Sequence, residues 1–338
     1  MKYLPPEYLN SPLNVKFEVT NNCNCKCLHC FNDSGVDVKA ELSTKQIFHV
    51  LNQLAEENVF AIHFTGGEPF IRRDIYELLG HAIDLGFSVS FTSNGSLINM
   101  SSAKFFSKND IEAEISLDSI IPFEHDTFRG RPGLCKKVLK SIKLLNENGT
   151  KISIATTVSK INANSIERLI DYLVKCNIPT ITISECLPVG RGAMNSNALL
   201  LSFEEKRKLI RTLERKITEY TGIIEIDYTL SFDFIIDAKR PERGCNAGIS
   251  TCAISSEGLV KPCPFFPADE NDSLLNKKFN EIWHGSKLLS KFRNGWIIEE
   301  CVHCKYWLTK CIGGCRAVPF IEGRGFYGAY RSCPILSM

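Results

Sequence analysis

The chain lacks the long hydrophobic runs that a membrane span or a secretion signal requires. No stretch of its 338 residues approaches the ~18 uninterrupted apolar residues of a membrane-spanning helix, and the first residues, 1–7, show no apolar core of a signal peptide. Net charge is also nearly absent, because 40 Lys and Arg against 38 Asp and Glu leave +2. We therefore expect a cytoplasmic protein whose main partner is neither nucleic acid nor a membrane.

Tandem repeats and low-complexity tails are absent as well, whereas cysteine is abundant. With 44% hydrophobic residues, the chain can bury cores for roughly two domains of about 100–200 residues each. In a reducing compartment, 15 cysteines indicate metal ligation or redox chemistry rather than disulfides. Most of them gather within residues 23–30 and 245–333. The isolated Cys135, Cys176 and Cys186 are expected to be small buried hydrophobes.

Short β-rich runs alternate with longer helical patterns from residue 14 to about 186. The predicted strands cover 15–20, 60–65, 88–92, 111–117, 152–158 and 180–184. The predicted helices cover 44–57, 74–85, 101–107, 134–147 and 163–176. This alternation implies parallel strands with right-handed crossovers. Six such units favour an α/β fold, a partial (β/α)6 TIM barrel with its chemistry at the carboxyl ends of the strands, although a flat doubly wound sheet stays open.

The pattern changes after the last of these strands. A loop-rich break covers 187–199, a charged amphipathic helix follows at about 203–220, and short strands with Cys-rich loops follow after about 240. We therefore expect a small Cys-rich α+β domain at the carboxyl end. The predicted segments are an N-terminal segment 1–14, the barrel 15–200, a linking helix and strand 201–240, and the Cys-rich domain 241–338.

The first group of cysteines follows the first predicted strand. Cys23, Cys27 and Cys30 form a C-x3-C-x2-C triplet on a short loop. Three thiolates there can hold three irons of a [4Fe–4S] cube and leave the fourth iron open to a small molecule. A closed zinc knuckle is the alternative, since zinc needs four ligands and Cys25 or His29 could complete the set.

A glycine pair follows the second predicted strand, in Gly66-Gly67-Glu68-Pro69. The two glycines let the backbone approach a ligand closely, and Glu68 could accept hydrogen bonds from an ammonium group. An ordinary strand-to-helix turn explains two glycines on their own. It does not explain them about 40 residues after the C-x3-C-x2-C triplet.

With these two motifs the chain resembles the radical S-adenosylmethionine (SAM) superfamily. The resemblance implies that Cys23, Cys27 and Cys30 ligate the SAM-cleaving [4Fe–4S] cluster and that Gly66, Gly67, Glu68 and Pro69 meet the amino end of SAM. Later motifs also match, and by resemblance three more residues line the SAM pocket: Asn94, Ser116 and Arg129. A guanidinium suits a carboxylate.

The second group of cysteines resembles the SPASM domain, a C-terminal extension of radical SAM enzymes that carries auxiliary iron–sulfur clusters. The spacing departs from that pattern once, with six residues between Cys304 and Cys311 where five are usual. The resemblance implies a first auxiliary set of Cys245, Cys263 and Cys315 and a second set of Cys301, Cys304, Cys311 and Cys333. Cys252 could complete the first set, but it lies in a plausible strand where a buried cysteine is ordinary. Two zinc ribbons are the alternative for this domain.

The nearest resemblance over the whole chain is to members that modify ribosomally made peptides, of the mycofactocin maturase and pyrroloquinoline quinone cross-linking types. It implies SAM, a SAM-cleaving cluster and two auxiliary clusters as cofactors, and an electron donor such as flavodoxin or ferredoxin. The implied substrate is a peptide, presented where needed by a separate leader-binding protein. A haem-biosynthesis enzyme acting on a tetrapyrrole and a non-catalytic, zinc- or cluster-stabilised binding protein are the alternatives. Tyr327, Tyr330, Glu185 and Asp227 are conceivable catalytic groups but have ordinary structural explanations.

Overall fold

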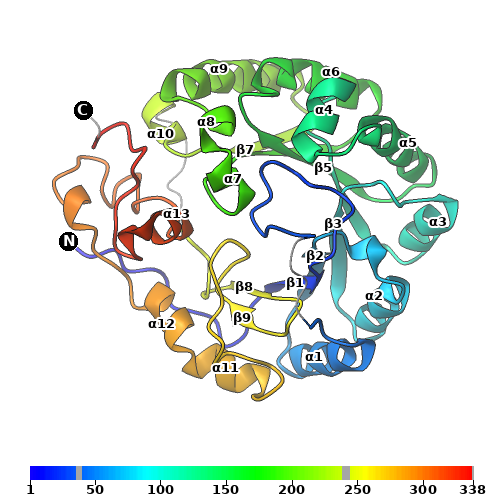
Figure 1. Cartoon of the computed structure of the whole chain (residues 1–338), viewed down its shortest axis with the longest axis horizontal. Coiled ribbons are helices and arrows are strands. Elements are labelled where there is room, and N and C mark those ends of the chain that lie inside the picture. The colour runs from blue at the N-terminus through cyan, green and yellow to red at the C-terminus, as the bar shows by residue number, and fades with distance from the viewer. Residues whose placement is uncertain (36–39, 238–243, 337–338) are drawn as a thin grey trace. The chain divides into compact units, whose positions relative to one another are not determined.

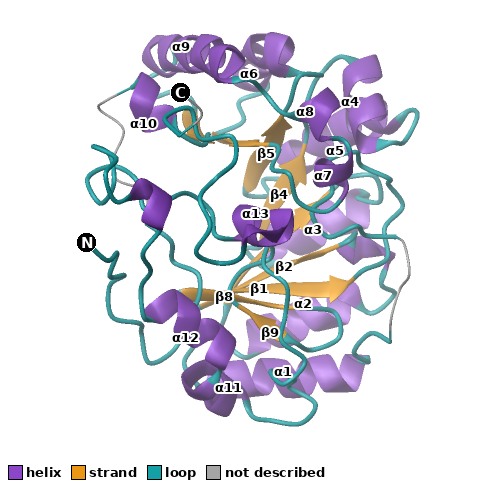
Figure 2. Ribbon diagram, turned by 60° about the vertical axis from the view of Figure 1, so that its left-hand side comes forward, coloured by secondary structure: helices purple, strands orange, loops and turns teal. Residues whose placement is uncertain are grey.

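A computed structural model describes residues 1–35, 40–237 and 244–336 (Figures 1 and 2). The chain forms two compact units, each made of separate stretches of sequence. Unit 1 contains Met1–Asn21, Val36–Val89 and Asp237–Met338, and unit 2 contains Asn22–Gly35 and Ser90–Ile236. The two units are defined by the contacts that residues make within the chain. The domain limits expected from the sequence stay a prediction.

Parallel strands form the centre of unit 2. They lie side by side in the order of the chain: β3 (Ser88–Ser93), β4 (Glu112–Ser116), β5 (Ile152–Val158), β6 (Thr180–Glu185) and β7 (Glu225–Thr229). Neighbouring strands in this series are parallel, with Phe91 opposite Ala113 and Ile115 opposite Ile154. The carboxyl ends of all five strands therefore meet at one edge.

The long helices that follow these strands cover one face of them (Figure 1): α3 (Met100–Lys108), α5 (Leu134–Glu147), α6 (Ile166–Lys175) and α9 (Phe203–Glu219). Four shorter helices are α4 (Pro122–Arg129), α7 (Arg191–Met194), α8 (Ser196–Leu199) and α10 (Asp233–Ile236). Helix α6 shows why, because Ile166, Leu169 and Leu173 recur at helical spacing and are fully buried. The alternate strand residues, which are polar except for Ala155, face away from these long helices.

Unit 1 joins the beginning of the chain to its end. Its strands lie in the order β2 (Ala61–Gly66), β1 (Asn14–Thr20), β8 (Thr251–Ile254) and β9 (Val260–Lys261). Strand β1 is parallel to both β2 and β8, with Val15 opposite Cys252, and β8 and β9 form an antiparallel pair. The Cys-rich segment therefore contributes a strand to the sheet that β1 begins.

The helices of unit 1 come from both ends of the sequence. They are α1 (Thr44–Glu56), the 3-10 turn η1 (Pro69–Ile71), α2 (Ile75–Asp84), α11 (Phe279–Gly285), α12 (Lys287–Arg293), η3 (Glu299–Cys301), α13 (Ala317–Pro319) and η4 (Phe320–Arg324). Helix α1 begins at Ser43, whose hydroxyl and Gln46 form a reciprocal capping box. Helix α11 lies against α1, where the Phe279 amide donates to the Gln53 side chain over 2.8 Å (Figure 2).

An aromatic core supports the cysteines of unit 1. Phe292, Trp296 and Phe326 are buried and pack against the thiol-bearing loops. The first residues of the chain belong to this core, because the Tyr3 and Trp296 backbones exchange hydrogen bonds of 2.9 and 3.0 Å. The Trp307 indole also donates to the Met1 carbonyl over 3.0 Å.

The α/β fold with a partial barrel is confirmed, and the predicted strands and helices match the observed ones within a few residues. Helix α4 and the pairing of β8 with β1 were not predicted. Cys135 and Cys186 are buried as expected, whereas Cys176 at the end of α6 is only partly buried. Among the described residues, no helix is both long and apolar enough to cross a membrane.

Candidate functional site

The cluster loop, residues 22–35 of unit 2, carries the C-x3-C-x2-C triplet. Its backbone amides point at two of the three sulfurs: the Cys25 N–H donates to Cys23 Sγ over 3.4 Å, and the Ser34 N–H donates to Cys30 Sγ over 3.4 Å. Hydrogen bonds to sulfur stabilise a thiolate and tune the potential of a cluster that it holds. The loop is therefore shaped to present thiolates.

The thiols of this loop differ in acidity. A hydrogen bond from the Cys25 thiol and the positive charge of Arg129, working against burial, lower the pKa of Cys27 to about 6. The pKa of Cys25 is raised by its hydrogen bonds to Cys23 and Cys27 and by burial. The lowered pKa favours a thiolate at Cys27, whereas the raised pKa favours a thiol at Cys25.

Helix α4 supports the loop from one side. The Leu28 amide donates to the Phe128 carbonyl over 2.9 Å. Gly130 ends the helix with φ +61°, and a Cβ there would lie 2.3 Å from the Lys26 carbonyl oxygen. Only glycine therefore lets α4 approach the cluster loop this closely.

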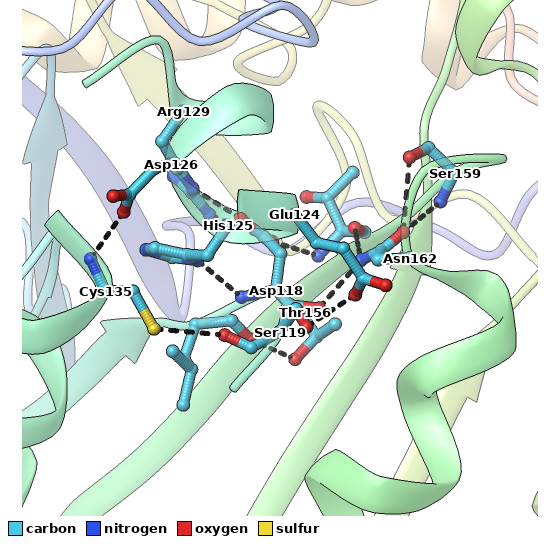
Figure 3. A network of polar contacts seen from close by, with 12 residues as sticks. Asp118, Ser119, Glu124, His125, Asp126, Arg129, Cys135, Thr156, Ser159 and Asn162 are labelled. Atoms are coloured by element: carbon cyan, nitrogen blue, oxygen red, sulfur yellow. Dashed lines mark hydrogen bonds and ion pairs between the residues drawn. The ribbon is translucent and has the colours of Figure 1, made fainter. Parts of the chain in front are cut away.

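Arg129 forms a buried ion pair with Asp118 (Figure 3). Asp118 is fully buried and accepts from Arg129 Nε over 2.5 Å and Nη2 over 3.1 Å, and also from the Thr157 amide over 2.9 Å. Burial would raise the pKa of Asp118, yet the charge and hydrogen bonds of Arg129 hold it below its usual range. Asp118 thus orients Arg129, a role that the sequence did not reveal.

His125 also lies in this network. Its Nδ1 accepts from the Asp118 amide over 3.2 Å, and burial lowers its pKa to about 4, so the ring is neutral (Figure 3). His29 of the cluster loop stacks on Phe128 with ring centroids 4.0 Å apart, and burial lowers its pKa to about 3. Both rings therefore add no charge to the Asp118–Arg129 pair.

Asn94 connects the end of β3 with the cluster loop. Its Nδ2 donates to Asn24 Oδ1 over 2.8 Å, and its Oδ1 accepts from the Ser96 amide over 3.0 Å. Arg131 closes the same group by donating to the Asn24 carbonyl over 3.2 Å. Ser116 is buried at the end of β4. Asn94 thus holds the cluster loop directly.

The Gly66–Pro69 segment lies in unit 1, at the end of β2. Gly66 has φ +132°, and a Cβ there would lie 2.2 Å from the Thr20 carbonyl oxygen, which also accepts from the Gly67 amide over 2.7 Å. Glu68 is fully buried and accepts from the Phe70 amide over 3.2 Å at the start of η1. A compact turn with a buried carboxylate therefore ends this strand.

The carboxyl end of β1 is held by Glu41. Its carboxylate accepts from the Thr20 hydroxyl over 2.9 Å and from the Asn21 amide over 2.6 Å. Arg72 adds bonds of 3.0 Å to the Val19 and Leu42 carbonyls. These contacts fix the point at which β1 enters the cluster loop, and neither side chain was predicted to do so.

The SPASM resemblance implies two sets among the C-terminal cysteines, and the charges acting on two of these thiols indicate some of their neighbours. In the first auxiliary set, burial raises the pKa of Cys263 to about 12, with added effects of the Cys315 and Cys245 charges. In the second set, burial raises the pKa of Cys301 to about 12, and the charges that act on it are those of Cys311, Cys333 and Cys304. Cys263 therefore lies near Cys245 and Cys315, and Cys301 lies near Cys304, Cys311 and Cys333.

Two side chains refine this picture. Cys252 is buried on β8, and the charge that acts on its thiol is that of Arg293 rather than that of the first auxiliary set. Arg316 is buried and donates to the Phe326 and Gly328 carbonyls over 3.0 Å. Its charge acts on thiols of both sets, including Cys301. Arg316 is a buried cation that the sequence did not identify.

These thiols fit iron–sulfur clusters. In residues 1–35, 40–237 and 244–336, no three Cys, His, Asp or Glu side chains converge on one point as ligands of a single metal ion. A cube binds its thiolates at separate corners and needs no such convergence. Backbone amides also donate to sulfurs in the auxiliary sets, as in the 3.2 Å contact from Gly313 to Cys311. Cationic iron would offset the mutual repulsion of the thiolates.

Comparison with known families agrees with this chemistry. Residues 17–173 match the model of the radical SAM superfamily, and residues 245–305 match the SPASM model, described as an iron–sulfur cluster-binding domain.

Two curated relatives align with most of the chain. The mycofactocin maturase MftC of Mycolicibacterium smegmatis is 29% identical, over 96% of this chain and 83% of that protein. The AdoMet-dependent heme synthase of Oleidesulfovibrio alaskensis is 30% identical, over 90% of this chain and 83% of that protein. Among solved structures, Streptococcus suis SuiB bound to S-adenosylmethionine matches with a TM-score of 0.82 at 21% identity, over 97% of this chain and 78% of that one.

Proposed function

Because this chain belongs to the radical SAM superfamily and carries a SPASM domain, we propose that it cleaves SAM reductively and oxidatively modifies a ribosomally made peptide. The radical SAM domain binds SAM and a [4Fe–4S] cluster, and the SPASM domain binds auxiliary iron–sulfur clusters. We propose a peptide as the substrate, and we also propose which residues hold the clusters and SAM. Cross-linking, decarboxylation and other C–H functionalisation are the reactions in question.

The residues that would hold these groups are those of the three thiol sets. Cys23, Cys27 and Cys30 would hold the SAM cluster, and the two auxiliary sets would hold one cluster each. When bound and reduced, the cluster and SAM supply a 5′-deoxyadenosyl radical, which can remove hydrogen from an unactivated C–H bond. The protein positions these partners and excludes water.

For SAM itself, Gly66–Pro69 would receive the amino end, with Asn94 and Ser116 lining the pocket. Arg129 would meet the carboxylate, and Asp118 holds its guanidinium in one orientation through two hydrogen bonds. Such positioning by a buried partner is what a preorganised site requires.

The charge on strands β3 to β7 is the observation that favours a peptide as the substrate. The side chains that face away from the helices are hydroxyls, one alanine and four carboxylates: Ser88, Ser90, Thr92, Glu112, Glu114, Ser116, Ser153, Ala155, Thr157, Thr180, Thr182, Ser184, Glu225, Asp227 and Thr229. None of these fifteen is a lysine or arginine. Glu114 lies mid-strand and accepts from the Thr92 hydroxyl over 2.5 Å.

The matching positions of unit 1 add little positive charge. Strands β1 and β2 carry Lys16, Glu18 and His63 there, with Lys16 opposite His63. Burial lowers the pKa of His63 to about 3, so this ring is neutral. The Lys261 ammonium is paired with Glu18 over 2.9 Å. A neutral or cationic peptide suits such surfaces, whereas the several carboxylates of a tetrapyrrole would be repelled.

Relatives support the same choice. A maturase of mycofactocin is among the matched proteins, and a solved structure of similar fold shows SuiB bound to the precursor peptide SuiA. We also propose an electron donor such as flavodoxin or ferredoxin, and a separate leader-binding protein where the peptide needs one.

The test begins with anaerobically purified protein. We expect about 12 iron atoms per chain if three cubes are bound, and 5′-deoxyadenosine from SAM when a strong reductant is added. Zinc in place of iron, or no SAM cleavage, would show instead a metal-stabilised binding protein. The Cys27→Ala variant is the control that should abolish cleavage.

The substrate is tested by mass spectrometry. The chain is co-expressed with short peptides encoded beside its gene, and we expect a loss of hydrogen or of carbon dioxide from one of them. In parallel, the purified enzyme receives iron coproporphyrin III. Haem synthesis is the second candidate, because relatives named AdoMet-dependent heme synthase are 30% identical. Porphyrin decarboxylation without peptide modification would establish that candidate instead.

A further inference from the structure

Arg191 contacts the cluster loop at four places, although it is distant from that loop in the sequence. Its backbone N–H donates to the Cys30 carbonyl over 2.9 Å, and its Nε donates to the Cys27 carbonyl over 2.8 Å. Its Nη1 donates to Asp33 Oδ1 over 2.6 Å and to the Ser34 carbonyl over 3.1 Å. The side chain is 14% exposed. One residue therefore binds the loop on both sides of its last cysteine.

The neighbours of Arg191 allow this close approach. Gly190 has φ +56°, and a Cβ there would lie 2.5 Å from both the Cys30 and Phe31 carbonyl oxygens. A Cβ on Gly192 would lie 2.4 Å from the Leu187 carbonyl oxygen. The side-chain Nδ2 of Asn195 donates to the Leu28 carbonyl over 3.1 Å. The segment 190–195 is thus built to lie against the loop.

The loop needs such support because it has no regular secondary structure of its own. Residues 22–35 form turns and bends, so their carbonyl groups need partners from elsewhere. Arg191 supplies several donors in one rigid fork, and its charge lies beside a loop that presents thiolates. Another cation near the loop, Arg129, is neutralised by the buried Asp118, whereas Asp33 is 43% exposed and offsets the Arg191 charge less.

We infer that Arg191 is a positioning residue that locks the cluster loop in its ligating shape and keeps the SAM cluster from being lost. The inference rests on the proposed assignment of Cys23, Cys27 and Cys30. It assigns a function to residues 187–199, which the sequence indicated only as a loop-rich break. The auxiliary sets belong to unit 1, whereas Arg191 and the loop that it contacts belong to unit 2.

The test compares Arg191→Met and Arg191→Lys with the wild type in the cluster-loaded protein. An iron chelator is added anaerobically, and the loss of each cluster is followed by electron paramagnetic resonance, in which the SAM cluster is recognised by its response to added SAM. Removing charge-assisted hydrogen bonds should make the SAM-responsive signal of Arg191→Met decay at least about tenfold faster. Arg191→Lys should fall between, because an ammonium keeps the charge but not the fork.

Two controls make the result specific. Arg207→Met removes an exposed arginine of α9 that pairs with Glu204 over 3.5 Å, and it should behave as the wild type. Gly190→Ala keeps Arg191 but displaces the loop, so it should also hasten the decay. Hydrogen exchange of residues 27–34 should rise in Arg191→Met, with the auxiliary signals unchanged.

Wild-type decay in Arg191→Met, or an equal loss of all signals with a lower melting temperature, would overturn the inference. Failure of the cysteine assignment looks different: Cys27→Ala would then keep the SAM-responsive signal.

Discussion

The Asp118–Arg129 pair offers a test of how strongly burial governs this site. Asp118→Asn keeps the shape of the side chain but removes the charge that faces Arg129 Nε at 2.5 Å. The two side chains are 0% and 10% exposed, so solvent cannot replace the lost partner. Leaving one charge of a buried pair uncompensated costs about 3–5 kcal/mol. At about 2–4 °C per kcal/mol for domains of 150–250 residues, the melting temperature should fall by roughly 6–20 °C.

The matched control is Asp110→Asn. Asp110 pairs with Lys151 over 2.7 Å, but these side chains are 75% and 63% exposed. Such pairs contribute about 0.2–1 kcal/mol, and Asn also suits the left-handed backbone at this position, where φ is 54°. Both variants are melted anaerobically at one scan rate, with unfolding followed by circular dichroism. A melting temperature of Asp118→Asn no lower than that of Asp110→Asn would refute the argument from burial.

The same pair predicts a pH dependence. Arg129 helps to hold the pKa of Asp118 below its usual range in the folded protein. A carboxylate of this kind stabilises the fold above its unfolded pKa of about 3.9 and loses the contribution as the pH falls through the folded value. The difference between wild type and Asp118→Asn should therefore be full at neutral pH and shrink in acid. A difference that grows in acid would contradict this sign.

Other predictions concern the ligands. Gly66→Ala should weaken SAM binding at least about tenfold, because the new Cβ would meet a carbonyl oxygen at 2.2 Å; Gly80→Ala, with nothing within 4 Å, should bind SAM normally, and calorimetry measures both. Cys25→Ala should keep its full iron content, because burial and hydrogen bonding keep that thiol protonated; a loss of about four irons would make it a ligand. Cys315→Ala should lose auxiliary iron and Cys252→Ala should not, as iron analysis of the two proteins will show; equal losses would place Cys252 in the first set.

Much of the fold could be predicted because the local sequence pattern indicates most of its strands and helices. Strands such as β5 and β6 are rich in β-branched residues, and helices such as α6 show apolar residues at helical spacing. Helix α4 was missed because its sequence, Pro122–Arg129, is short and polar, and two of its three buried residues are His125 and Arg129. The pairing of β8 with β1 joins residues far apart in the chain, which no local pattern reports.

The same distinction between local pattern and long-range contact applies to the site. Cysteine spacing predicts the ligands, because a cluster needs several thiolates on short loops, and this requirement does not depend on the neighbouring residues. The supporting contacts have no such spacing: Asp118 and Arg191 each look like an ordinary polar residue of a loop, and only the folded chain brings Arg191 to the Cys27 carbonyl. A buried charge is recognised by its partner, and the partner is known only from the structure. Ligand identity is therefore local information, whereas the orientation and retention of the ligands are tertiary properties.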